Sequence, residues 1–160
     1  MKNYITNFPL VEYFGCDGSD PEIEPWKSWF SGADPLLGRN LAEPLWWHFC
    51  DILSHFEELT CQHLGISHPS YEALEATLYD HLSLAESIRG GPLVPANIYN
   101  LKHFMISGGV KNNSTLEMLV LAYCIWCVDR LIDALYANDA MFASLMISNV
   151  FCATNDFSNR

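Results

Sequence analysis

The sequence predicts an all-α fold, with a single domain of about five helices around a central buried helix. Apolar residues recur at three- and four-residue spacing along several segments, while the period-two alternation that is typical of strands is absent. The 160 residues suit one domain. Within the stretch 116–136, the eleven residues from Met118 to Val128 carry no charge. A helix that is apolar on every side is a buried helix, so we expect the other helices to pack around this one.

Residues 1–40 form an irregular arm, in which prolines and glycines prevent any long helix. The arm is rich in aromatic residues, whereas disordered tails are poor in them. We therefore expect it to be ordered and packed on the helical part, residues 41–160. Trp26 and Trp29 are three residues apart and share a face of a short helix predicted over 24–31. They either fill the core or contact a partner, because tryptophan is favoured at the centre of interfaces.

Two long helices follow the arm. The first is predicted over 44–64, with Pro44 in its first turn and Gly65 just past its end. The second is predicted over 69–88, again with a proline in its first turn and with two glycines after it. Spacing of three and four residues defines the face that each helix turns to the core. The core-facing residues are Leu45, Phe49, Ile52, Phe56 and Leu59 in the first helix, and Tyr71, Leu74, Leu78, Leu82 and Ala85 in the second.

Three further helices complete the predicted fold. A short helix is predicted over 96–107, between a proline and a pair of glycines. The central helix follows, and Ser114 with Glu117 three residues later predicts a capping box at its start. The last helix is predicted over 140–153. Its apolar residues are the expected contact with a second copy of the chain, and they are Phe142, Leu145, Met146, Val150 and Phe151.

Composition bears on location and partners. The chain is 50% hydrophobic and only 17% charged, so part of its apolar surface is expected to be an interface, and a homodimer is predicted. A net charge of −11 disfavours binding to nucleic acid and membranes and favours a basic protein partner. The central apolar run is shorter than the ~20 residues that span a bilayer. The start of the sequence lacks a secretion-signal pattern, and the cysteines, including Cys124 and Cys127, are predicted to be reduced, buried thiols. Both features favour the cytoplasm.

The most informative feature lies between Arg39 and Arg89. These 49 residues carry eight carboxylates and no lysine or arginine, so the two long helices are expected to share an acidic face. This face is either the solvated side of an acidic protein or a docking surface. Docking is the functional interpretation, because charge of a single sign costs self-repulsion that mixed charge would avoid. The predicted partner-binding residues are Asp51, Glu57, Glu58, Glu72 and Glu75, together with Trp26 and Trp29.

Two constellations suggest metal chemistry. His48, Asp51 and His55 lie on one stripe of the first long helix, and histidine with carboxylate at helical spacing can bind a divalent metal. Asp129 and Asp133 are four residues apart on the central helix, an arrangement suited to magnesium and pyrophosphate. In outline this pairing resembles the all-α nucleotide pyrophosphohydrolases, from which it departs in the spacing of the acids. The structural alternatives are a solvated helix face for the first constellation and an ordinary ion pair for the second.

Three functions are therefore open. The first is a non-enzymatic regulatory protein, of the inhibitor, immunity or anti-defence type, that docks its acidic helical face on a basic protein and needs no cofactor. The second is a metal-dependent hydrolase of a phosphorylated small molecule that uses one of the two constellations. The third binds a small apolar ligand in a pocket beside the tryptophan-rich arm. The first ranks highest, because the sequence contains no phosphate-binding loop, no His-Glu-x-x-His and no nucleophile elbow.

Overall fold

The computed structural model describes residues 3–7, 9–14 and 29–158. All regular secondary structure in this part of the chain is helical, which confirms the predicted all-α class. The helices are α1 (Leu10–Phe14), α3 (Ala33–Leu37), α4 (Ala42–Leu64), α5 (Tyr71–Arg89), α6 (Ile98–Ser107), α7 (Asn113–Tyr136) and α8 (Ala140–Ser158). Helices α4 to α8 correspond to the five predicted helices, and α1 and α3 lie in the segment that was predicted to contain no long helix.

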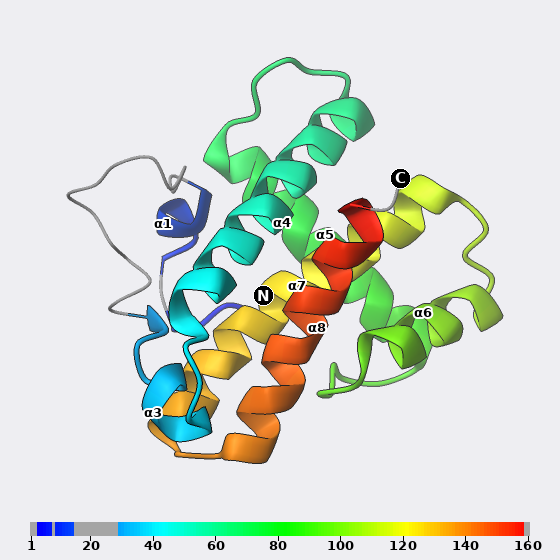
Figure 1. Ribbon diagram of the computed structural model, residues 1–160. Coiled ribbons are helices and arrows are strands. Elements are labelled where there is room, and N and C mark those ends of the chain that lie inside the picture. Colours follow the sequence, from blue (N-terminus) through cyan, green and yellow to red (C-terminus); the bar gives the residue numbers. More distant parts are fainter. Residues whose placement is uncertain (1–2, 8, 15–28, 159–160) are drawn as a thin grey trace.

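Helix α7 is the centre of the fold. It contacts α4, α5, α6 and α8. Figure 1 shows α7 passing behind α8, with α4 on one side and α6 on the other. All eleven residues of the uncharged run from Met118 to Val128 are buried, which confirms the predicted central helix. Removing the surface of this helix from water on every side is a major driving force for the other helices to assemble around it.

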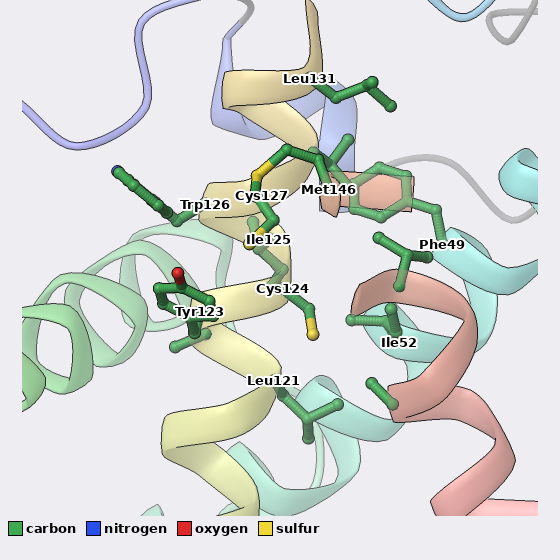
Figure 2. Packing of buried hydrophobic residues seen from close by; sticks show 14 of the residues in the cluster. Phe49, Ile52, Leu121, Tyr123, Cys124, Ile125, Trp126, Cys127, Leu131 and Met146 are labelled. Atoms are coloured by element: carbon green, nitrogen blue, oxygen red, sulfur yellow. The ribbon is translucent and has the colours of Figure 1, made fainter. Parts of the chain in front are cut away.

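The core between α4, α7 and α8 is built from apolar side chains of all three helices. Figure 2 shows Phe49 and Ile52 of α4 and Met146 of α8 lying near Cys124 and Cys127 of α7. None of these five side chains is more than slightly exposed, and the predicted inner stripe of α4 is buried throughout. Each apolar side chain of the size of phenylalanine or isoleucine contributes ~1.5–3 kcal/mol when it is fully buried.

An aromatic cluster joins the N-terminal part of the chain to this core. Tyr13 of α1 packs edge-on against Phe49, with ring centroids 4.8 Å apart. Trp29 packs against Trp46 of α4 in the same manner, at 5.8 Å. Trp29 therefore takes part in core packing, which is one of the two roles predicted for it. Trp26 lies outside the described residues.

The segment before α1 is held by a buried carboxylate of α7. Asp129 has no exposed surface. Its side chain accepts hydrogen bonds from the backbone N–H groups of Thr6 and Asn7, at 3.2 and 2.9 Å, and one from the Thr6 hydroxyl at 3.2 Å. The guanidinium of Arg130 forms an ion pair with the same carboxylate. A buried charge is stable only when it is paired and hydrogen-bonded, so these contacts both satisfy Asp129 and fix residues 6 and 7 on α7.

The turn before α6 is fixed by two polar side chains that reach it from the core. The Tyr123 hydroxyl accepts a hydrogen bond from the Ala96 N–H at 2.8 Å and donates one to the Val94 carbonyl at 2.7 Å. Asn149 of α8 is buried. Its side chain accepts from the Ile98 N–H at 3.0 Å and donates to the Ala96 carbonyl at 2.8 Å. Backbone groups that lose water on burial thus regain hydrogen bonds, and these bonds hold the turn before α6. The helix itself is capped by Asn97, whose side-chain oxygen accepts a hydrogen bond from the Tyr99 N–H at 2.8 Å.

Two details of the predicted helices are wrong. The cap of α7 is Asn112, whose side-chain oxygen accepts a hydrogen bond from the Ser114 N–H at 2.8 Å. Ser114 therefore lies inside the first turn and does not form the predicted capping box with Glu117. In α5, Tyr71 is 40% exposed and does not face the core as predicted. It is the first residue of the helix, and the buried stripe begins one turn later at Leu74.

Helix α8 is a core helix. Met146 and Val150 have no exposed surface, and Phe142, Leu145 and Phe151 pack against the same core. The apolar residues that were expected to contact a second copy are therefore used within the chain, because α8 packs on both α7 and α4. Phe142, Leu145 and Phe151 are only partly buried, so contact of this helix with a second copy stays a prediction, as does the homodimer.

Candidate functional site

The outer face of α4 carries a row of exposed side chains. Because the inner face of the helix is turned to the core, residues at the opposite positions point to solvent. The helix contains no lysine or arginine, so no basic side chain of its own interrupts the negative charge of this face. We call the following residues, which are all exposed and are spaced three or four apart, the α4 outer row: Glu43, Trp47, Asp51, Ser54 and Glu58.

Trp47 is the unusual member of the α4 outer row. It is 48% exposed, although its neighbour Trp46 is buried in the aromatic cluster. An exposed indole keeps apolar area in contact with water, at a cost of about 25 cal/mol per Å². Tryptophan is also one of the residues that contribute most to binding at protein interfaces. The sequence prediction missed Trp47, although its position opposite the stripe that includes Leu45 and Phe49 was sufficient to place it on the outer face.

A surface pocket of about 580 Å³ lies at the N-terminal end of the α4 outer row. One oxygen of Asp34 accepts hydrogen bonds from the N–H groups of Leu41 and Ala42, at 2.7 and 2.8 Å. Asp34 thereby caps α4, whose own N-cap residue provides no side-chain hydrogen bond. The pocket therefore combines two carboxylates and an amide with an indole ring. Its lining residues are Asp34, Asn40, Glu43, Pro44 and Trp47.

The predicted partner-binding carboxylates differ in exposure. Asp51 and Glu58 of α4 and Glu72 of α5 are exposed, while Glu57 and Glu75 are partly buried. Burial raises the pKa of Glu57. Exposed carboxylates keep most of their hydration and can exchange it for a basic group, so Asp51, Glu58 and Glu72 are the members best suited to contact a partner.

One carboxylate of the acidic stretch has an internal role. Glu86 of α5 accepts a hydrogen bond from the Tyr4 hydroxyl and another from the Leu93 N–H at 3.0 Å. These bonds connect α5 to the N-terminal segment and to the turn before α6. The exposed acidic surface is therefore smaller than the number of carboxylates in the sequence implies.

The histidines of the predicted metal stripe contact two different helices. The ring of His48 lies 4.6 Å from the ring of Phe151 on α8. The Nε2 atom of His55 lies 3.4 Å from a carboxylate oxygen of Glu117 on α7, whereas Asp51 points to solvent. Within the residues that the structure describes, no three His, Cys, Asp or Glu side chains are grouped so that they could hold a metal ion. The metal hypothesis for this stripe gains no support from the structure.

The second constellation does not form an open pair of acids. Asp129 is buried and bound to the N-terminal segment, whereas the side chain of Asp133 is 51% exposed and lies 3.0 Å from the Arg130 guanidinium. This arrangement agrees with the structural alternative of an ion pair and leaves Asp129 without a face for a metal.

The cysteines of the described part are free thiols. Cys124 and Cys127 of α7 have no exposed surface. Burial raises the pKa of Cys127 to about 12, so its thiol is protonated at neutral pH. A nucleophilic cysteine must be an accessible thiolate, and these two residues are therefore core residues, as predicted.

A second surface pocket, of about 390 Å³, lies beside Trp29. Ile132 and Leu135 of α7 line it with Gly32, and Tyr136, which is 87% exposed, stands at its side. Asn7 also lines this pocket, and more of the pocket's lining surface is polar than apolar. It lies in the region where the sequence predicted a ligand pocket, next to the tryptophan-rich arm.

Two general findings bear on function. In the described part of the chain, no helix combines the length and the apolar character that crossing a membrane requires. A scan against protein-family models, a search of curated proteins and a search of solved structures each found no match to the chain.

Proposed function

We propose that this chain is a non-enzymatic binding protein that docks the α4 outer row on a basic surface of a protein partner. The observation that carries the proposal is the exposed indole of Trp47 between Glu43 and Asp51, on a helix that has no lysine or arginine. An aromatic residue supplies buried contact area, while flanking charge of one sign selects the partner and speeds the encounter. The net charge of −11 acts in the same direction.

The chemistry of the surface fits lysine and arginine side chains. A basic side chain that entered the pocket beside Trp47 would meet the indole together with the carboxylates of Asp34 and Glu43. A cation over an indole is worth ~0.5–2 kcal/mol, and hydrogen bonds between charged groups are about twice as strong as those between neutral groups. Asp51 and Glu58 lie about two helical turns apart, so they extend the same surface by ~10 Å along α4.

A surface of this kind suits a protein that blocks a basic groove, as inhibitors, immunity proteins and anti-defence factors do. The residues proposed to make the closest contacts are those of the α4 outer row and Asp34. Glu57, Glu72 and Glu75 belong to the edge of the contact in this proposal.

The test compares two double variants that change net charge equally at different places. Asp51→Lys with Glu58→Lys alters the α4 outer row. Asp80→Lys with Asp133→Lys alters exposed acids of α5 and α7. The probe is a synthetic arginine-rich peptide, and its affinity is measured by calorimetry at low and at moderate salt.

We expect the outer-row variant to bind the peptide at least about tenfold more weakly, which is ~1.4 kcal/mol. The matched control is expected to lose much less affinity. Trp47→Ala should weaken binding while leaving its salt dependence unchanged, because this change removes contact area and no charge. Equal weakening in both double variants would show that net charge alone attracts the peptide, and the proposal would then be wrong.

One observation favours a second function, the binding of a small apolar ligand, and this is the pocket beside Trp29. The probe for this function is the fluorescent dye 1-anilinonaphthalene-8-sulfonate. We expect its fluorescence to rise with the natural sequence and with Met141→Trp, which adds an indole at an exposed position. Leu135→Trp, which fills the pocket, should abolish the rise. Dye fluorescence that does not depend on Leu135 would remove this candidate.

A further inference from the structure

A third cavity, of about 180 Å³, lies where the end of α4 and the middle of α5 meet the start of α7. It is separate from both pockets described above. Unlike them, it is lined mainly by uncharged polar groups and contains two imidazoles. The polar residues of its lining that matter here are Gln62, His63, His81, Ser114 and Thr115.

His81 is one of the residues that line this cavity. The residue is only 8% exposed. Its Nδ1 atom lies 2.8 Å from the carbonyl oxygen of Thr77. A carbonyl can only accept a hydrogen bond, so Nδ1 carries the proton and Nε2 of the neutral ring is an acceptor. Within the described residues, no protein group is hydrogen-bonded to Nε2.

The protonation state of His81 follows from its surroundings. Burial is the main cause that lowers the pKa of His81, and nearby His63 lowers it further, while the bond to Thr77 and the charge of Asp80 act in the opposite direction. This direction agrees with the tautomer that the bond to the Thr77 carbonyl indicates. A neutral imidazole with one nitrogen fixed by a backbone carbonyl is the usual form of a metal-binding histidine.

His63, in the last turn of α4, brings a second imidazole to the same place. The ring centroids of His63 and His81 are 5.9 Å apart, and the ring planes are inclined at 76°. A zinc ion lies ~2.0–2.1 Å from a histidine nitrogen, which puts it ~3.2 Å from the ring centre. If two rings share one ion, their centres lie ~5.2 Å apart when the nitrogen–metal–nitrogen angle is tetrahedral and ~6.4 Å apart when it is linear. The observed separation falls within this range.

We propose that His63 and His81 bind one divalent transition-metal ion of the class that prefers imidazole, such as Zn²⁺ or Cu²⁺. Water and the amide and hydroxyl oxygens of the cavity complete the coordination. Because the protein supplies only two nitrogens, the ion is exchangeable and is not required for folding.

The local electrostatics permit a cation at this position. His63 lies at the C-terminal end of α4, where the helix dipole favours positive charge. The opposing dipole at the start of α7 is weakened, because Asn112 already caps the N–H groups of Ser114 and Thr115 at 2.8 and 3.2 Å. An anion is the less suitable ligand, since the free nitrogen of neutral His81 has no proton to donate.

The test titrates the full chain with Zn²⁺ alone, by calorimetry, after treatment with a chelator. We expect one ion to bind per chain, and His63→Ala, at an exposed position, to weaken the affinity at least about tenfold. His68→Ala is the matched control, since it removes another exposed histidine outside the cavity, and it should leave the affinity unchanged.

A second measurement identifies the ligands directly. With Cu²⁺ as the probe, the electron paramagnetic resonance spectrum should show coupling to two nitrogens in the natural sequence and to one nitrogen in His63→Ala. The proposal is overturned if the chain binds no Zn²⁺, if His68→Ala weakens binding as much as His63→Ala, or if the Cu²⁺ spectrum is the same in both proteins.

Discussion

Replacement of Asp129 by alanine should destabilise the protein far more than the same replacement one turn later, at Asp133. Both carboxylates pair with Arg130. They differ in burial, because Asp129 is fully buried while the side chain of Asp133 is 51% exposed. They also differ in that Asp129 alone binds the N–H groups of Thr6 and Asn7. The pair of variants therefore isolates the contribution of a buried carboxylate from that of a surface ion pair.

The expected loss in free energy of unfolding depends on which groups each replacement deprives of a partner. Removing one partner of a buried ion pair costs about 3–5 kcal/mol when the other charge is left without compensation. In Asp129→Ala, Arg130 keeps its ion pair with Asp133, which lowers this cost. The side chain of Arg130 is 25% exposed and Thr6 lies at the surface, so water can partly replace the lost bonds. We therefore expect about 3 kcal/mol for Asp129→Ala, at the lower end of that range. An exposed pair is worth about 1 kcal/mol or less, which sets the expectation for Asp133→Ala.

Chemical unfolding followed by circular dichroism measures both free energies. For a chain of this size, 1 kcal/mol corresponds to about 2–4 °C, so Asp129→Ala should also lower the melting temperature by about 6–12 °C. Limited proteolysis should cut Asp129→Ala near its N-terminus faster than Asp133→Ala, because residues 6 and 7 lose their hydrogen bonds to the carboxylate. They keep the bond from Arg130 to the Thr6 hydroxyl and the bond from the Asn7 side chain to the backbone carbonyl of residue 129. If the two variants unfold with the same free energy, Asp129 does not hold the N-terminal segment in the way that the structure indicates.

Three further predictions concern stability. Phe49→Ala should lower the free energy of chemical unfolding by about 3–5 kcal/mol. Tyr136→Ala, at a position that is 87% exposed, should change it by no more than about 0.5 kcal/mol. Similar values for both variants would contradict the packing described for α4. Asp34→Ala should cost about 1 kcal/mol through loss of the α4 cap, and Asp34→Asn should restore most of it. Burial lowers the folded-state pKa of His81, so its contribution to stability is complete above its ordinary value of 6.5 and is lost as the pH falls below it. With metal chelated, the free energy of unfolding should therefore fall more steeply between about pH 7.5 and pH 5 in the natural sequence than in His81→Gln.

The parts of the fold that followed from the sequence are those set by local pattern. The inner stripe of α4 and the uncharged run of α7 repeat a helical spacing over several turns, and such periodicity leaves few alternatives. The start of α7 shows where local pattern fails. Asn112 and Ser114 are both good capping residues, and the sequence alone does not show at which of them the chain leaves the preceding turn.

The candidate sites depend more on contacts between distant segments. Asp129 looked like one member of an acidic pair on a helix, because its actual partners, Thr6 and Asn7, are more than 120 residues away in sequence. The approach of His63 to His81 depends on how α4 and α5 are placed by the turn between them. Trp47 differs from these cases, since its exposure follows from its position on α4 and was predictable from the sequence.

The central claim is that the α4 outer row docks on a basic protein, and affinity capture with matched baits tests it most directly. The baits are the natural sequence, Asp51→Lys with Glu58→Lys, and Asp80→Lys with Asp133→Lys, each incubated with lysate of cells that produce the chain. We predict that one basic protein is retained at fixed stoichiometry by the natural sequence and by the second double variant, and is lost from the outer-row variant. Retention of the same protein by all three baits, or a retained partner that is acidic, would contradict the claim.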